Sequence, residues 1–155
     1  MITLAFYKGN GGNAVAKAAD RLVRAVTLSR YSHVEVIAGT ADLDAPAWCV
    51  SSSLRDGGVR GKRMTLRADR WDLVEVPGPC FTPVNRFLSL RGGMPYDFLG
   101  ALLSPLRLPT EPRTTKGAWF CSEVAAQIMG VPDPWAYSPG RLYRATTRGK
   151  LKCAG

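Results

Sequence analysis

The stretch that decides the fold is residues 119–129, WFCSEVAAQIM, where an extended start passes into a helical pattern at Cys121. Apolar residues then recur at the spacing of one helix face, and Gly130 followed by Pro132 ends the pattern. We therefore predict that Cys121 lies at or near a helix N-terminus. Unpaired backbone N–H groups and the positive end of the helix dipole favour a thiolate there. The same N–H groups can hold an oxyanion. A buried structural cysteine is the alternative.

Upstream of this helix the pattern is mostly that of strands. Residues 13–28 have amphipathic helical spacing behind Asn13 as an N-cap. We predict strands at residues 2–7, 33–38, 48–52, 59–66 and 71–76. Short helices are predicted at residues 83–90, 96–103 and 140–145, with a Pro- and Thr-rich loop at 106–116. The order predicts one α+β domain over residues 1–155, with a mostly antiparallel sheet.

His33 is the only histidine in the chain, and it opens the alternating segment HVEVIA. If acid–base chemistry occurs near neutral pH, this residue is the default, although a lone histidine is often structural. A Cys–His pair also needs a group that orients the imidazole. Glu35 shares a strand face with His33, so we prefer it for that third place. The alternative is a serine on the next predicted strand: Ser51, Ser52 or Ser53.

The order of these features resembles the permuted branch of the NlpC/P60 superfamily. The likeness is greatest to phage and prophage proteins described as distant relatives of cell-wall-associated hydrolases. The resemblance is carried by YSHVEVI at 31–37, SSSLRDGGVRGK at 51–62, WDLVEV at 71–76, YDFLG at 96–100, WFCSEVAA at 119–126 and SPGRL at 138–142. It implies a circularly permuted papain-like fold, in which the nucleophile helix follows the strands. It also implies a thiol nucleophile at Cys121, a general base at His33 and a third polar residue.

The resemblance further implies that Tyr96 lies near the oxyanion region. We expect Ser122 and Trp119 on the same oxyanion or substrate side. Two positions depart from the family pattern. The usual D-C-S-G is F-C-S-E here, so Glu123 replaces a small residue, and no second histidine exists to serve as the third residue.

The implied activity is that of a cysteine peptidase or amidase, acting on a peptide linkage in bacterial peptidoglycan. Two other readings stay open. One is a thiol enzyme that transfers acyl groups on lipids or esters, because permuted relatives include lipid-acting members. The other is a catalytically silent phage structural or binding module, which would have a buried, unreactive Cys121 beyond hydrogen-bonding distance of His33.

The charge balance is +9, with 21 Lys and Arg against 12 Asp and Glu. Such an excess favours an anionic partner such as a cell wall. The basic residues are spread along the chain without a block of like charges, so we do not expect nucleic-acid binding. No apolar run approaches the ~20 residues that span a bilayer. The N-terminus lacks the basic start and apolar length of a signal peptide. We therefore expect a protein that is cytoplasmic as synthesised and, following the resemblance, associated with a phage virion.

The remaining cysteines and the hairpin arginines carry weaker expectations. No CxxC pair occurs and only one histidine is present, so we expect neither a metal nor another cofactor. Without an export signal, stable disulfides are not expected, and Cys49, Cys80 and Cys153 are interpreted as buried or incidental thiols. Arg55 and Arg60 could hold a carboxylate or phosphate, or lie in a hairpin with solvated charges.

Overall fold

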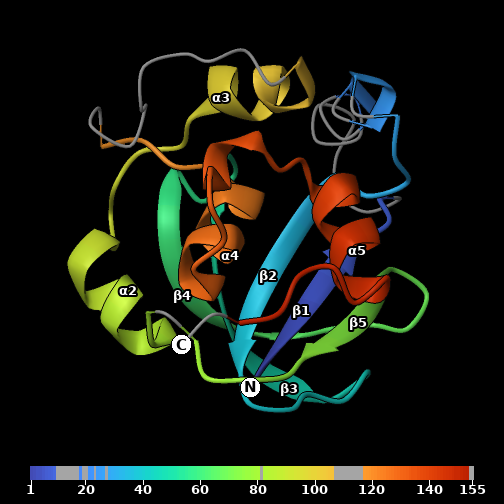
Figure 1. Ribbon diagram of the computed structural model, residues 1–155, viewed down its shortest axis with the longest axis vertical. Coiled ribbons are helices and arrows are strands. Elements are labelled where there is room, and N and C mark those ends of the chain that lie inside the picture. The colour runs from blue at the N-terminus through green and yellow to red at the C-terminus, as the bar shows by residue number, and fades with distance from the viewer. Residues whose placement is uncertain are drawn as a thin grey trace.

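A five-stranded antiparallel sheet forms the centre of the protein, in the order β4–β3–β2–β1–β5 (Figure 1). The structure, a computed structural model, describes residues 1–9, 18, 21–22, 24–26, 28–80, 82–106 and 117–153. The strands are β1 (Ile2–Tyr7), β2 (His33–Ala38), β3 (Pro46–Ser53), β4 (Gly58–Thr65) and β5 (Trp71–Val76). This sheet and the helices beside it confirm the predicted α+β class.

The central strand β1 pairs along its whole length with β2 on one side and β5 on the other. Its residues from Ile2 to Phe6 are all buried, which explains why the segment is apolar almost throughout. In the pairing with β2, Ile2 lies opposite Ala38 and Tyr7 lies opposite His33. The register therefore brings His33 to the end of the sheet where β1 ends.

The helices after the region of residues 13–28 follow the five strands, as predicted. They are α2 (Val84–Arg91), α3 (Phe98–Leu103), α4 (Cys121–Met129) and α5 (Pro139–Thr147), with 3₁₀ turns η1 (Ser104–Leu106) and η3 (Pro134–Ala136). Figure 1 shows α4 and α5 against one face of the sheet. Among the described residues, no helix has both the length and the apolar character needed to cross a membrane.

The main core lies between the sheet and α4. Alternation along β2 turns Val34 and Val36 into this core, where they join Val124 and Ile128 of α4. A smaller apolar cluster lies on the other face of the sheet and contains strand residues that alternate with those of the main core, among them Ala5, Ile37 and Cys49. Glu35 alternates with Val34 and Val36 along β2, so its side chain does not point into the core between the sheet and α4.

The predicted helix over residues 13–28 is only partly within the described residues. Residues 18, 21–22 and 24–26 are helical, whereas Asn13 lies outside the described residues. Of its apolar residues that the structure describes, Leu22 is 46% exposed and Val26 is 37% exposed, so these two do not lie in the core. Most of the predicted loop at 106–116 also lies outside the described residues.

Gly58 fixes the hairpin of β3 and β4 to the segment that precedes α3. Its φ is +151°, and a Cβ there would lie 2.0 Å from the carbonyl oxygen of Met94. The next amide, of Val59, donates to that same Met94 oxygen at 2.8 Å, and Val59 O accepts from Gly93 N–H at 2.9 Å. The glycine in the DGGVR motif therefore permits a backbone approach that no side chain would allow.

Candidate active site

Cys121 is the first residue of α4, which confirms the predicted junction of an extended segment with a helix. Phe120 before it is extended, with φ −116° and ψ 164°. The Glu123 carboxylate accepts the Phe120 N–H at 3.4 Å, so Glu123 caps the first turn of the helix. N–H groups of a first helical turn have no acceptor within the helix. They therefore lie beside the Cys121 thiol as potential donors to an oxyanion.

The backbone of Trp119 holds this junction in place. Its N–H donates to Pro95 O at 3.0 Å, and its carbonyl oxygen accepts from Asp97 N–H at 3.0 Å. The same oxygen accepts from the buried Ser52 hydroxyl at 2.6 Å. The position of Cys121, two residues later, is thus set by the strand β3 and by the segment that leads into α3.

The Y-D-x-x-G motif has a local structural cause. Asp97 is the N-cap of α3, and its carboxylate accepts the Gly100 N–H at 2.7 Å. A Cβ on Gly100 would lie 2.1 Å from that carboxylate, so the motif needs glycine for the cap to close. Tyr96 is half-buried and forms an isolated parallel bridge with Trp119. Tyr96 therefore lies next to the segment that carries the nucleophile candidate.

His33 interacts with both Cys121 and Glu35. Its Nε2 lies 2.8 Å from Glu35 Oε1. Burial of the imidazole lowers the pKa of His33, but the charge of Cys121 and a hydrogen bond with it, together with Glu35, raise that pKa to about 10. The ring is therefore held as an imidazolium at neutral pH, although its side chain is only 19% exposed.

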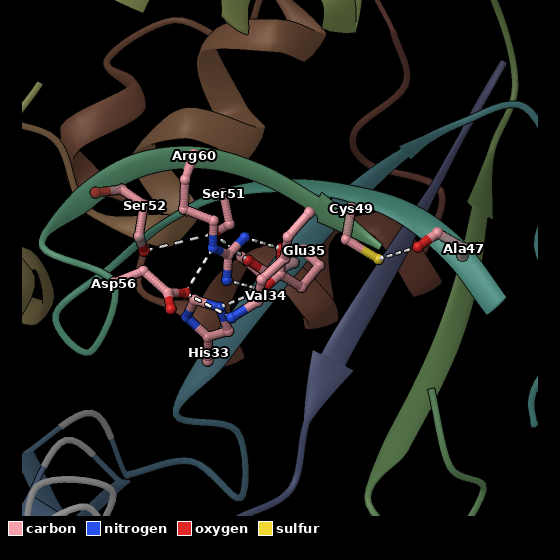
Figure 2. Close-up of polar contacts among 10 residues, drawn as sticks. His33, Val34, Glu35, Ala47, Cys49, Ser51, Ser52, Asp56 and Arg60 are labelled. Atoms are coloured by element: carbon pink, nitrogen blue, oxygen red, sulfur yellow. Dashed lines mark hydrogen bonds and ion pairs between the residues drawn. The ribbon is translucent and has the colours of Figure 1, made fainter. Parts of the chain in front are cut away.

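Glu35 is the partner that orients His33, and it is itself held by Arg60. The carboxylate is 1% exposed and accepts from Arg60 at 2.6 and 2.5 Å (Figure 2). Burial raises the pKa of Glu35, but hydrogen bonds from Arg60 and His33 outweigh it, so the net pKa is lowered. Glu35 consequently stays ionised at neutral pH and supplies a fixed negative charge behind the imidazole.

The charged network continues beyond Arg60. Its Nε donates to Asp56 Oδ2 at 2.6 Å, and Lys62 donates to the same oxygen at 2.7 Å. Figure 2 shows Arg60 between Asp56 and Glu35, with its guanidinium directed at both carboxylates. Arg60 holds a carboxylate, as one of its two expected roles required, but the carboxylates are those of Glu35 and Asp56. The other expectation, a solvated charge, is wrong, because the Arg60 side chain is only 15% exposed. Arg55 is exposed on the turn.

The three serines that were the alternative to Glu35 as the residue that orients His33 do not make that contact in the described structure. Ser51 Oγ donates to Val34 O at 2.6 Å, and Ser52 Oγ donates to Trp119 O at 2.6 Å. Ser53 is half-buried at the end of β3. Within the described part of the chain, Glu35 is the member of this set that contacts His33. The sequence offered both Glu35 and the serines as the residue that orients His33, and the 2.8 Å contact of Glu35 with His33 distinguishes between them.

Two residues expected on the substrate side have buried side chains instead. The Trp119 ring is 2% exposed and meets Phe87 edge to face at 5.3 Å, because α2 packs over it. Ser122 is fully buried in α4, and its hydroxyl has no hydrogen-bond partner among the described residues. Neither side chain is placed to meet a substrate directly, so only their backbone groups remain candidates for such contact.

The sequence did not reveal Asp56 as a site residue, nor that Arg60 binds Glu35. Both Arg60 and Asp56 lie in the hairpin motif RDGGVRGK, where the sequence left open whether the arginines bind an anion or are solvated. The signal that could have identified Arg60 is Glu35 itself, because a buried glutamate on a strand requires a cationic partner. In the described residues, no group of three or more His, Cys, Asp or Glu is arranged to hold a metal ion.

Comparison of the chain with family models, with curated proteins and with solved structures gives no match. The likeness to the NlpC/P60 superfamily therefore stays a prediction from the sequence motifs.

Proposed function

We propose that the protein is a cysteine hydrolase that cleaves an amide bond, with Cys121 as the nucleophile and His33 as its acid–base partner. The observations that carry this proposal are the contacts of His33 with Glu35 and of Glu35 with Arg60, together with the raised pKa of His33, to which Cys121 contributes. An imidazolium that carries its proton at neutral pH is suited to stabilise a neighbouring thiolate. A buried carboxylate behind the ring is the third group that such a pair needs.

The reaction follows from this arrangement in two steps. The Cys121 thiolate attacks the carbonyl carbon, and N–H groups of the first turn of α4 stabilise the oxyanion. His33 gives its proton to the leaving amine as the C–N bond breaks, which leaves a thioester. A water molecule then loses a proton to His33 and attacks the thioester carbonyl. The acid product leaves, and the thiolate and imidazolium are restored.

For the substrate we propose a peptide linkage in bacterial peptidoglycan. The support is the ordered motif resemblance together with the net charge of +9, which suits an anionic wall. The position of α4 after β1 to β5 is compatible with the permuted papain-like arrangement. Association with a phage virion is part of the same proposal and has the same support.

Burial of Cys121 bears on the alternative of a catalytically silent module. That reading required a buried thiol that is also beyond hydrogen-bonding distance of His33. Cys121 is 2% exposed, so the first requirement is met. Against the second, Cys121 helps to raise the pKa of His33 through its charge and a hydrogen bond, which supports a close approach of the two side chains. An active enzyme of this design must admit its substrate to a thiol that is covered in the free protein.

A lipid- or ester-directed acyl transfer is the second candidate, and one observation favours it. The helix α3 begins directly after Tyr96 and Asp97, and its first two residues are large, apolar and exposed. Phe98 is 43% exposed and Leu99 is 57% exposed. An apolar surface beside the segment that holds Cys121 would suit an acyl chain.

Digestion of purified peptidoglycan tests the proposal. The wild type and the control variant Cys80→Ser, which changes a cysteine on the loop after β5, should release the same new amino termini under reducing conditions. Cys121→Ala and His33→Gln should release fewer than about 1% of these, as expected when a nucleophile or its base is removed. Equal release by Cys121→Ala would overturn the proposal. Hydrolysis of short-chain acyl esters with no release from peptidoglycan would favour the second candidate.

A further inference from the structure

Cys80 and Cys153 meet near the C-terminal end of α4, whereas Cys121 is the first residue of that helix. Their sulfur atoms lie 3.1 Å apart, although 73 residues separate them in the chain, and both are free thiols. The backbone supports the same approach, because the Cys153 N–H donates to Pro77 O at 3.4 Å. The segment after α5 therefore lies on the loop that follows β5 through two kinds of contact.

We propose that Cys80 and Cys153 are a disulfide-forming pair, and that their bond fastens the segment after α5 to the loop after β5. The oxidant is a low-molecular-weight disulfide such as oxidised glutathione. The expectation from the sequence was two incidental thiols, because the spacing of cysteines in a chain does not reveal which of them meet in the fold. A disulfide requires the sulfurs to close to ~2.05 Å, a shift of about 1 Å that side-chain rotation can supply.

Thiol–disulfide exchange accounts for every atom and electron of this step. The Cys80 thiolate attacks one sulfur of oxidised glutathione and expels one glutathione thiolate. Cys153 then attacks the Cys80 sulfur of the mixed disulfide and expels the second glutathione. Two protein thiols are oxidised, one glutathione disulfide is reduced to two thiols, and the two protons go to the released thiolates.

The surroundings of the two thiols give this exchange a direction. Cys80 is half-buried, whereas Cys153 is 8% exposed. Burial, with the neighbouring Cys80, raises the pKa of Cys153 to about 12. Cys80 is thus the thiol that meets the external disulfide first, and Cys153 is the one held in place to resolve the adduct.

The pair is remote from the candidate active site. The Thr82 N–H donates to Ile128 O at 3.2 Å, which places the loop after β5 at the C-terminal end of α4. Cys121 begins that helix, so the loop after β5 lies at the end of α4 away from Cys121. The disulfide proposal therefore does not depend on the proposed function, and either can fail without the other.

The test is oxidation of the whole protein with glutathione disulfide, followed by denaturation, alkylation of remaining thiols and peptide mapping. The expected result is loss of two alkylation sites and recovery of one peptide pair linked through Cys80 and Cys153. Since the bond closes a long loop, the Tm should rise on the order of 5–10 °C on oxidation. Cys80→Ser and Cys153→Ser should show neither the linked pair nor the rise.

Two results would overturn the proposal. One is alkylation of all four cysteines after oxidation. The other is a stable glutathione adduct on Cys80 without the linked peptides, since resolution by Cys153 would then have failed. Cys49→Ser provides the matched control, because Cys49 is fully buried, its thiol faces Ala47 O at 3.7 Å, and its loss should leave the linked pair unchanged.

Discussion

Arg60 donates two hydrogen bonds to the buried carboxylate of Glu35, at 2.6 and 2.5 Å. This ion pair supports the candidate site from behind the imidazole, because Glu35 also contacts His33. Arg60 is further fixed by Asp56, which Lys62 contacts in turn. A buried ion pair gains little over an apolar replacement of both partners, but loss of one partner leaves an isolated charge. The network therefore makes the orientation of His33 depend on a residue that never touches Cys121.

Replacement of Arg60 by methionine tests this dependence. Arg60→Met leaves the carboxylate of Glu35 buried without its strongest partner, so we expect a loss of about 3–5 kcal/mol in the free energy of unfolding. Urea denaturation measures it. Arg63→Met is the matched control, because Arg63 lies on the same strand β4 but is exposed, and it should cost less than about 0.5 kcal/mol. The double variant Arg60→Met, Glu35→Leu should recover much of the loss. Equal effects of Arg60→Met and Arg63→Met would contradict the role of the pair.

Glu35→Gln should shift the titration of His33. The folded pKa of about 10 exceeds the ordinary value of 6.5, partly because of the Glu35 carboxylate. Protonation of His33 thus contributes stability that is complete below pH 6.5 and is lost as pH rises through 10. Without the carboxylate, and with Arg60 left nearby, the pKa should fall by on the order of one unit or more. The alkaline limb of amide hydrolysis should move to lower pH by the same amount.

The shift is measured by NMR titration of the single imidazole and by the pH profile of kcat/KM. Glu75→Gln is the matched change, because Glu75 lies exposed on β5, and both profiles should stay where they are in the wild type. An unchanged imidazole titration in Glu35→Gln would show that the 2.8 Å contact does not govern His33.

Alkylation should separate Cys121 from Cys49. Burial raises the pKa of Cys49 to about 12, so its thiolate is scarce at neutral pH. Cys121 has the imidazolium of His33 beside it, which favours the thiolate. We expect iodoacetamide at pH 7 to modify Cys121 at least about tenfold faster than Cys49, because the thiolate of Cys49 is scarce. Peptide mapping over time gives both rates in one sample.

The same measurement in His33→Gln tests the cause of that difference. Loss of the imidazolium should slow alkylation of Cys121 and leave the rate at Cys49 unchanged. If Cys121 reacts no faster than Cys49 in the wild type, its burial dominates and the thiolate proposal fails.

The sequence predicted the parts of the fold that have a local cause. The alternation of HVEVIA and the helical spacing after Cys121 both reflect the period of one element, and both elements were found. The α+β class followed from the order of these elements. Residues 22 and 26 were misleading, because helical periodicity identifies an apolar stripe but not whether another element covers it.

Relations across the chain could not be predicted in the same way. The partner of Glu35 lies two strands away, so the sequence could not identify Glu35 as the carboxylate that Arg60 binds. Trp119 stood two residues from the nucleophile candidate, yet packing of α2 turned its ring into the core. Cys80 and Cys153 met for the same reason, through the return of the chain after α5. Each depends on contacts between distant segments, which periodicity does not encode.

Gly58 and Gly57 offer a stability test in which only one of two neighbouring glycines is enclosed. Both have positive φ, +151° and +82°, so each substitution by alanine carries a backbone cost of about 1 kcal/mol. A Cβ at Gly57 meets nothing within 4 Å, whereas one at Gly58 would lie 2.0 Å from Met94 O. Gly58→Ala must therefore separate the hairpin from the segment that leads to Tyr96, and we expect it to cost at least about 2 kcal/mol more than Gly57→Ala. Urea denaturation compares the two variants.

The same pair of variants tests the link from this hairpin to Cys121. The segment after Met94 is hydrogen-bonded through Pro95 and Asp97 to Trp119, which precedes Cys121. Gly58→Ala should therefore also slow alkylation of Cys121, while Gly57→Ala should leave it unchanged. Equal stabilities would mean that the β3–β4 hairpin and the Met94 backbone do not make the close contact that positions the site.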